Sequence, residues 1–139
     1  MKKISLVCTL ILISAFSTLI KAQTSQETLN QILEFSKSKK FAEASSLIAY
    51  DGVDEAKKFK MPFNPKDEND LNSVKRICKK IKALIDISDS YEIGAPVEKE
   101  KDGFNWTVIE VSFKSGSQNL KTLFSFVKVG EKFLLGDIN

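Results

Sequence analysis

Two different spacings of hydrophobic residues follow one another along the chain. Over residues 24–50, and again over about residues 67–87, apolar residues recur every three or four positions, as on one face of a helix. From Ser90 onward they alternate with polar residues, as on one face of a strand. Because the helical part precedes the strands rather than alternating with them, the pattern predicts an α+β fold with an antiparallel sheet.

Residues 24–50 predict two helices in tandem. Thr24 or Ser25 can cap the first, and the lysine-rich residues 37–40 form the joint between them. The second helix begins at Phe41, where the helical spacing of apolar residues resumes.

A third helix is expected after a stretch without a clear period. Residues 52–66 are hard to assign, and two prolines within residues 61–65 predict a loop there. The helix then runs from about Asp67 to about Ile87, with apolar residues three and four positions apart.

Four strands are expected in the last third of the chain. They occupy about residues 91–98, 104–114, 120–129 and 132–138. Asp102-Gly103 is typical of a two-residue hairpin turn. Pro96 cannot donate to a strand ladder, so the first strand is expected to be an edge or bulged there. The expected architecture is a four-strand meander with the helices packed on one of its faces.

The first 22 residues have the anatomy of a bacterial secretory signal peptide. Lys2 and Lys3 precede the apolar run of residues 4–20, and Ala22 is a small residue suited to cleavage. We therefore expect a signal peptide over residues 1–22 and a single α+β domain over residues 23–139, secreted or periplasmic. An uncleaved membrane anchor is the alternative, because a run of 17 residues reaches the lower limit for a bilayer span.

Charge and composition exclude several classes of function. The formal net charge of +3 comes from three lysines in the first 22 residues, and the remainder holds 18 basic and 18 acidic residues. A neutral domain with one arginine does not favour nucleic-acid binding, which depends on a basic surface. The chain has no histidine, the usual general base, and no glycine loop or cysteine pair typical of a phosphate or zinc site. We expect no cofactor and no metal.

The chain has two cysteines, of which only Cys78 lies outside the predicted signal peptide. No internal disulfide is then expected after cleavage. Cys78 shares a predicted helix face with Val74 and Ile81, so we expect a buried thiol of low reactivity.

The order of helices and strands has a counterpart in a known superfamily. Residues 41–44, Phe-Ala-Glu-Ala, open a second helix before an aspartate-glycine stop, a further helix leads into long antiparallel strands, and the chain ends on the strand within residues 129–138. In this, residues 23–139 resemble the nuclear-transport-factor-2-like superfamily, in particular its small secreted bacterial members of unknown function, and are similar to the cystatin-like arrangement. The resemblance implies a curved sheet wrapped against the helices as a cone, whose interior is often a ligand pocket.

Four aromatic residues on three predicted strands are the candidate ligand-binding residues: Tyr91, Trp106, Phe124 and Phe126. Each belongs to an alternating apolar series, and such positions on antiparallel strands can lie side by side on one face. If the helices cover that face as the resemblance implies, the four rings line a cavity of at least ~300 Å³. A filled core would use the same residue types and is the alternative.

Two function hypotheses from different classes follow. The first is an exported, non-enzymatic module that binds a small apolar ligand or an envelope or secreted partner protein, with a homodimer through the sheet as one form of assembly. The alternative is a small isomerase- or hydrolase-like pocket enzyme with a carboxylate base such as Glu110 or Asp137. The basic run within residues 75–82 is expected to be a solvated helix face rather than a binding surface. No catalytic residue is assigned.

Cleavage of the signal peptide gives a direct test of location. The protein isolated from cells is expected to begin at or near Gln23 and to lie outside the cytoplasm, because charge, apolar run and small residue follow in the order that signal peptidase requires. Mass spectrometry of the native protein measures this. An intact Met1 start in the soluble fraction would contradict the prediction.

Overall fold

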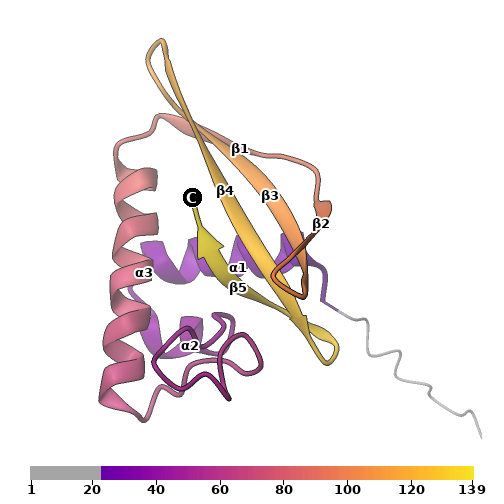
Figure 1. The fold of residues 1–139 in the computed structure, drawn as a ribbon. Coiled ribbons are helices and arrows are strands. Elements are labelled where there is room, and N and C mark those ends of the chain that lie inside the picture. The colour runs from indigo at the N-terminus through magenta and orange to yellow at the C-terminus, as the bar shows by residue number, and fades with distance from the viewer. Residues whose placement is uncertain (1–22) are drawn as a thin grey trace, which may run out of the picture.

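The computed structural model describes residues 23–139, so the predicted signal peptide of residues 1–22 lies outside the described residues. Within this part of the chain, helices precede strands: α1 (Ser25–Lys37), α2 (Phe41–Ser45), α3 (Glu68–Asp86), β1 (Ser90–Ile93), β2 (Val97–Lys101), β3 (Phe104–Ser115), β4 (Gln118–Val129) and β5 (Lys132–Ile138). The strands form one curved sheet, with α1 crossing behind it and α3 standing along its side (Figure 1). The predicted α+β fold is confirmed.

Helix α1 begins with reciprocal capping bonds. The Thr24 hydroxyl accepts from the Glu27 N–H at 3.1 Å, and the Glu27 carboxylate accepts from the Thr24 N–H at 3.2 Å. Its apolar stripe of Leu29, Ile32 and Leu33 is fully buried against the sheet. The stripe orients α1 across the concave face.

The second predicted helix is shorter than expected. It ends at Ser45, and the following residues extend the sheet beyond β5. The Leu135 N–H donates to the Leu47 carbonyl at 2.9 Å, and the Ala49 N–H donates to the Leu135 carbonyl at 2.8 Å. Residues 47–49 thus pair the N–H and the carbonyl of Leu135, which the edge of the sheet would otherwise leave without a partner.

Helix α3 matches its prediction closely. The Asp67 carboxylate caps it by accepting from the Asp70 N–H at 3.0 Å. Val74, Cys78 and Ile81 are its fully buried residues and pack into the same core as α1. This places Cys78 on the inner helix face, as expected.

The sheet is antiparallel, with β1 and β2 both paired to the same side of β3 in the order β1-β3-β4-β5. The first predicted strand is therefore divided in two, and the sheet has five strands instead of four. The division falls at residues 94–96, where Pro96 has no N–H to donate. Across the break, only the Gly94 N–H reaches β3, donating to the Glu110 carbonyl at 2.8 Å.

The two faces of the sheet hold different clusters of apolar residues. The principal core lies between the sheet and the helices and includes Ile109, Phe113, Phe124 and Phe126. A smaller cluster lies on the opposite, outer face, where Val127 and Leu134 pack with Phe59, Phe104 and Trp106. Both faces of β3 are therefore apolar over part of its length.

The burial of Cys78 predicts its reactivity. Burial raises the pKa of the thiol, and a hydrogen bond with Ser36 lowers it only in part, so little thiolate forms near neutral pH. A charged maleimide is expected to leave the folded protein unlabelled and to label it fully in denaturant, as measured by mass spectrometry. Labelling at equal rates in both states would show that α3 presents Cys78 to solvent.

Candidate functional site

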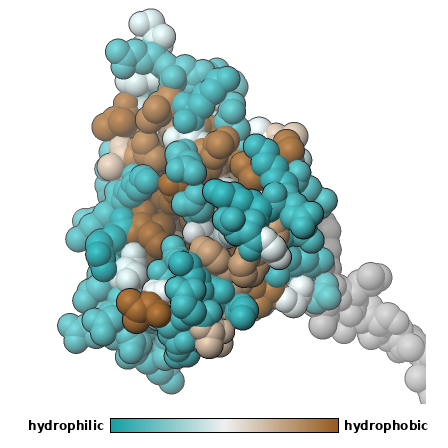
Figure 2. Space-filling view, in the orientation of Figure 1, coloured by the Kyte–Doolittle hydropathy of each residue, from teal (hydrophilic) through white to brown (hydrophobic). Residues whose placement is uncertain are grey.

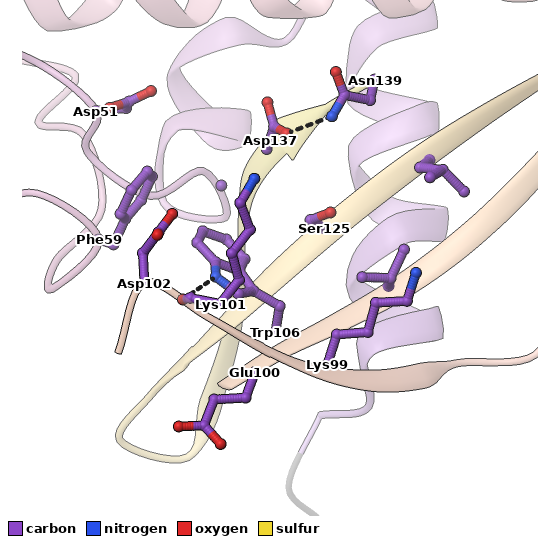
Figure 3. Close-up of a pocket in the computed structure, with 13 residues that line it drawn as sticks. Asp51, Phe59, Lys99, Glu100, Lys101, Asp102, Trp106, Ser125, Asp137 and Asn139 are labelled. Carbon is purple, nitrogen blue, oxygen red and sulfur yellow. Dashed lines mark hydrogen bonds between the residues drawn. The ribbon is translucent and has the colours of Figure 1, made fainter. Parts of the chain in front are cut away.

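A groove of about 400 Å³ lies on the outer face of the sheet. Its floor is formed by outer-face residues of β3 and β4, namely Trp106, Val108, Leu123 and Ser125. One wall is the segment of residues 51–59, and the other is β2 (Figure 3). We call this the Trp106 groove. Figure 2 shows apolar residues between hydrophilic ones on this face, which is turned away from α1.

Trp106 is held in place from several sides. Its indole N–H donates to the Lys101 carbonyl at 3.3 Å. The ring of Phe59 meets it edge-on, with centroids 5.1 Å apart and planes at 80°. Phe104 lies next to it at 6.2 Å. These contacts fix the orientation of a ring that is only partly buried and still lines the groove.

Gly136 accepts the far edge of the Trp106 ring. A Cβ atom at this position would lie 2.5 Å from Cζ3 of Trp106, which no real side chain allows. The pairing of β4 with β5 shifts register at this point, so that Ser125 faces Asp137 while Phe126 faces Leu135. Gly136 is the extra residue of a β-bulge, a feature that re-aims neighbouring side chains.

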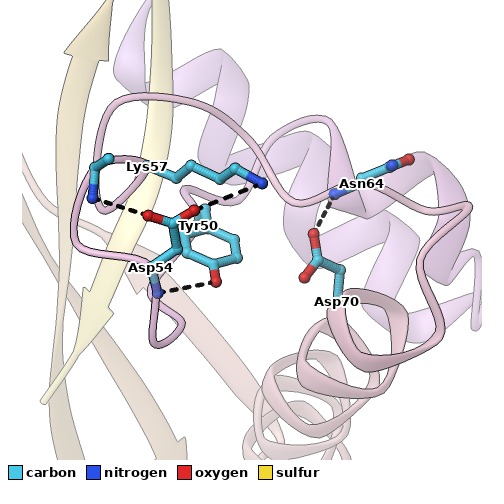
Figure 4. Close-up of polar contacts among 6 residues, drawn as sticks. Tyr50, Asp54, Lys57, Asn64 and Asp70 are labelled. Atoms are coloured by element: carbon cyan, nitrogen blue, oxygen red, sulfur yellow. Dashed lines mark hydrogen bonds and ion pairs between the residues drawn. The ribbon is translucent and has the colours of Figure 1, made fainter.

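The groove wall of residues 51–59 is anchored by Tyr50 and Phe59. Phe59 has a φ of 57°, in the left-handed region that a bulky residue seldom adopts, and its N–H donates to the Tyr50 carbonyl at 2.9 Å. The Tyr50 hydroxyl accepts from the Asp54 N–H at 3.3 Å, and Lys57 forms an ion pair with Asp54 (Figure 4). The strained backbone of Phe59 directs its ring toward Trp106.

The rim of the groove carries charges of both signs. Lys99 and Lys101 project from β2, and Asp102 and Asp137 lie near Lys101 (Figure 3). Within residues 23–139, no ion pair involves Lys99, Lys101 or Asp102. Asp51, which also lines the groove, is paired with Lys58, and Asp137 accepts a hydrogen bond from the Asn139 amide at 3.1 Å. Lys99, Lys101 and Asp102 are therefore available to a ligand.

The structure does not bring together the four predicted ligand-binding residues. Phe124 and Phe126 are 0 % exposed in the principal core, and Tyr91 packs on Phe113 with centroids 5.8 Å apart on the same face. Trp106 lies on the outer face. It pairs with Val127, and paired residues share a face, whereas Phe126, the neighbour of Val127 in β4, points into the principal core. The expectation of four rings side by side on the helix-covered face is wrong, and only Trp106 lines the groove.

Several residues that build the groove could not be identified from local sequence patterns. Phe59, Lys99, Lys101 and Gly136 come from the unassigned loop, the charged hairpin and the last strand. One signal was present in the sequence. Residues 104–113 are apolar at both odd and even positions, which is typical of a strand buried on both faces.

The two candidate carboxylate bases are both exposed. Glu110 lies on the outer face with 46 % of its side chain exposed and pairs with Lys121 at 3.6 Å. Asp137 lies on the groove rim. Within residues 23–139, every buried polar side chain is a serine or threonine. Neither Glu110 nor Asp137 is therefore a buried carboxylate of the kind that a pocket enzyme uses as a base.

Residues 23–139 contain no cluster of three or more potential metal ligands. None of the helices in residues 23–139 combines the length and apolar character needed to cross a bilayer.

Comparisons with known proteins give one similar structure. No protein-family model matches the chain, and no curated protein matches it. A solved structure named Rd1NTF2_05, a designed NTF2-like protein present as a variant with several substitutions, is 14% identical with a TM-score of 0.45. The match covers 81% of this chain and 90% of the designed chain.

The contact of Gly136 with Trp106 predicts a coupled pair of substitutions. Gly136→Ala is expected to destabilise the protein by about 1–3 kcal/mol, because the added methyl group overlaps the indole ring. In a Trp106→Phe background the same change is expected to cost much less, since the smaller ring leaves room. Urea unfolding followed by circular dichroism measures both. Equal costs in the two backgrounds would show that the ring does not lie against Gly136.

Proposed function

We propose that the protein is an exported, non-enzymatic binding module whose ligand occupies the Trp106 groove. The observation that supports this most strongly is the partly exposed indole on the floor of a groove of about 400 Å³ with a polar rim. Binding sites for small molecules combine apolar floors with a few polar groups and commonly measure ~300–1,000 Å³. Export is supported by the anatomy of residues 1–22.

The groove favours a small ligand over a large partner protein. It is concave and bounded by β2 on one side and residues 51–59 on the other. Stable protein interfaces instead bury about 800 Å² on each partner, over a broader surface. A second hollow of about 560 Å³ adjoins it and shares Lys99, Glu100 and Trp106.

The contacts of the two candidate carboxylates, Glu110 and Asp137, favour a binding role over an enzymatic one. Glu110 is paired with Lys121, and Asp137 is exposed and hydrogen-bonded to Asn139. A general base that works at neutral pH needs a carboxyl group whose surroundings disfavour its charge. Neither residue has such surroundings. The groove positions ligands without offering a poised proton acceptor.

Trp106 is the only tryptophan in the chain, so its fluorescence reports on the groove alone. The neutral apolar probe N-phenyl-1-naphthylamine is expected to quench Trp106 by energy transfer when it binds. Trp106→Ala should weaken binding of the probe at least about tenfold, while destabilising the protein by less than the ~3–5 kcal/mol of a fully buried tryptophan. Probe fluorescence measures binding, and urea unfolding measures stability.

Leu120→Ala is the matched control, because Leu120 is an exposed apolar residue at the far end of β4 and does not line the groove. It should leave probe binding unchanged. If Leu120→Ala loses binding of the probe while Trp106→Ala retains it, the probe binds outside the groove. Absence of any binding by the wild-type protein, to this probe and to the sugars named below, would contradict the proposed function.

A further inference from the structure

We infer that the ligand of the Trp106 groove is a neutral carbohydrate whose ring lies against the indole of Trp106. The inference rests on the proposed function and names its ligand class. It depends on one juxtaposition: a fixed aromatic ring on the groove floor, with hydrogen-bond donors and acceptors of both charges around it.

The indole is already held in one orientation before a ligand arrives. Gly136 lies behind its far edge, Phe59 meets it edge-on, and its N–H is bonded to the Lys101 carbonyl. A ring fixed in this way loses little conformational freedom on binding. The faces of an indole carry negative potential, which attracts the C–H groups on the apolar face of a pyranose ring.

The rim supplies the partners that hydroxyl groups need. Lys99 and Lys101 donate, Asp102 and Asp137 accept, and the Asn139 amide does both. In Figure 3, the side chains of Lys101 and Asp137 extend on the same side of Trp106, Lys101 from β2 and Asp137 from the end of β5. Each hydroxyl of a sugar is both a donor and an acceptor, so a rim of mixed type suits it better than a rim of one type.

The same rim disfavours three other classes of ligand. A cation or an anion would be attracted by one pair of rim charges and repelled by the other, since Lys99 and Lys101 oppose Asp102 and Asp137, so the rim favours neither sign. An alkyl chain would have to desolvate these charges without pairing them, at a cost that the short apolar floor does not offset. A neutral molecule with many hydroxyl groups and one apolar face avoids all three costs.

The experiment uses the isotope-labelled protein and sugars of known structure. Methyl glucoside, methyl galactoside, methyl mannoside, N-acetylglucosamine and maltose are titrated separately while the amide signals of Ser125 and Gly136 and the indole signal of Trp106 are followed by NMR. We expect at least one sugar to shift these signals with a saturable curve. Sorbitol, an open-chain polyol that has hydroxyl groups but no ring face, should not.

Two pairs of variants test the roles of the ring and the rim. Trp106→Ala should weaken sugar binding at least about tenfold, whereas Trp106→Phe should retain most of it, because phenylalanine keeps a ring at that position. Asp137→Asn should weaken it about threefold to tenfold through loss of a charged acceptor. Glu131→Gln is the matched control, since Glu131 is exposed in the turn between β4 and β5 and lines neither hollow, and it should have no effect.

The outcomes separate the inference from the proposed function. If N-phenyl-1-naphthylamine quenches Trp106 while none of the sugars shifts the groove signals, the groove binds ligands but the carbohydrate inference is wrong. If sorbitol binds as well as the sugars, the ring face plays no part and the inference is again wrong. If neither the probe nor any sugar binds, the proposed function fails together with it.

Discussion

The antiparallel pairing of β3 with β4 is the contact on which the rest of the described structure depends. Its register is continuous from Trp106–Val127 to Ser115–Gln118 and determines which face every residue of both strands occupies. A shift by one residue would move Phe124 and Phe126 out of the principal core and onto the outer face. The same set of backbone hydrogen bonds therefore sets both the core under the helices and the groove on the other side.

The helices and the approximate strands could be predicted because their signals are local. The spacing of Val74, Cys78 and Ile81 is enough to identify the buried face of α3, and the prediction of its ends was correct to within about a residue. The joint between α1 and α2 and the turn at Asp102-Gly103 follow from similarly short patterns.

The site could not be predicted in the same way, because it depends on contacts between distant segments. Phe59 and Gly136 both touch Trp106, yet nothing near either residue in the sequence indicates a partner on β3. The register of β4 on β3 is likewise a long-range property. Phe124 was placed beside Trp106 because both lie in alternating apolar series, and alternation alone does not say which of two faces a series occupies. The segment after Ser45 continues the helical spacing of apolar residues, and nothing local indicates that it pairs with Leu135 at the other end of the chain.

The two edges of the sheet are protected by unlike means. At β5, residues 47–49 pair with the backbone of Leu135. At the other edge, every residue of β2 is exposed, and its glutamates and lysines alternate next to the break in the strand at Pro96. An incoming strand would find no unbroken ladder to join there and would have to bring charges against this row. Self-association into ribbons is thereby opposed without a covering helix. The same edge also opposes strand exchange between copies that are still folding.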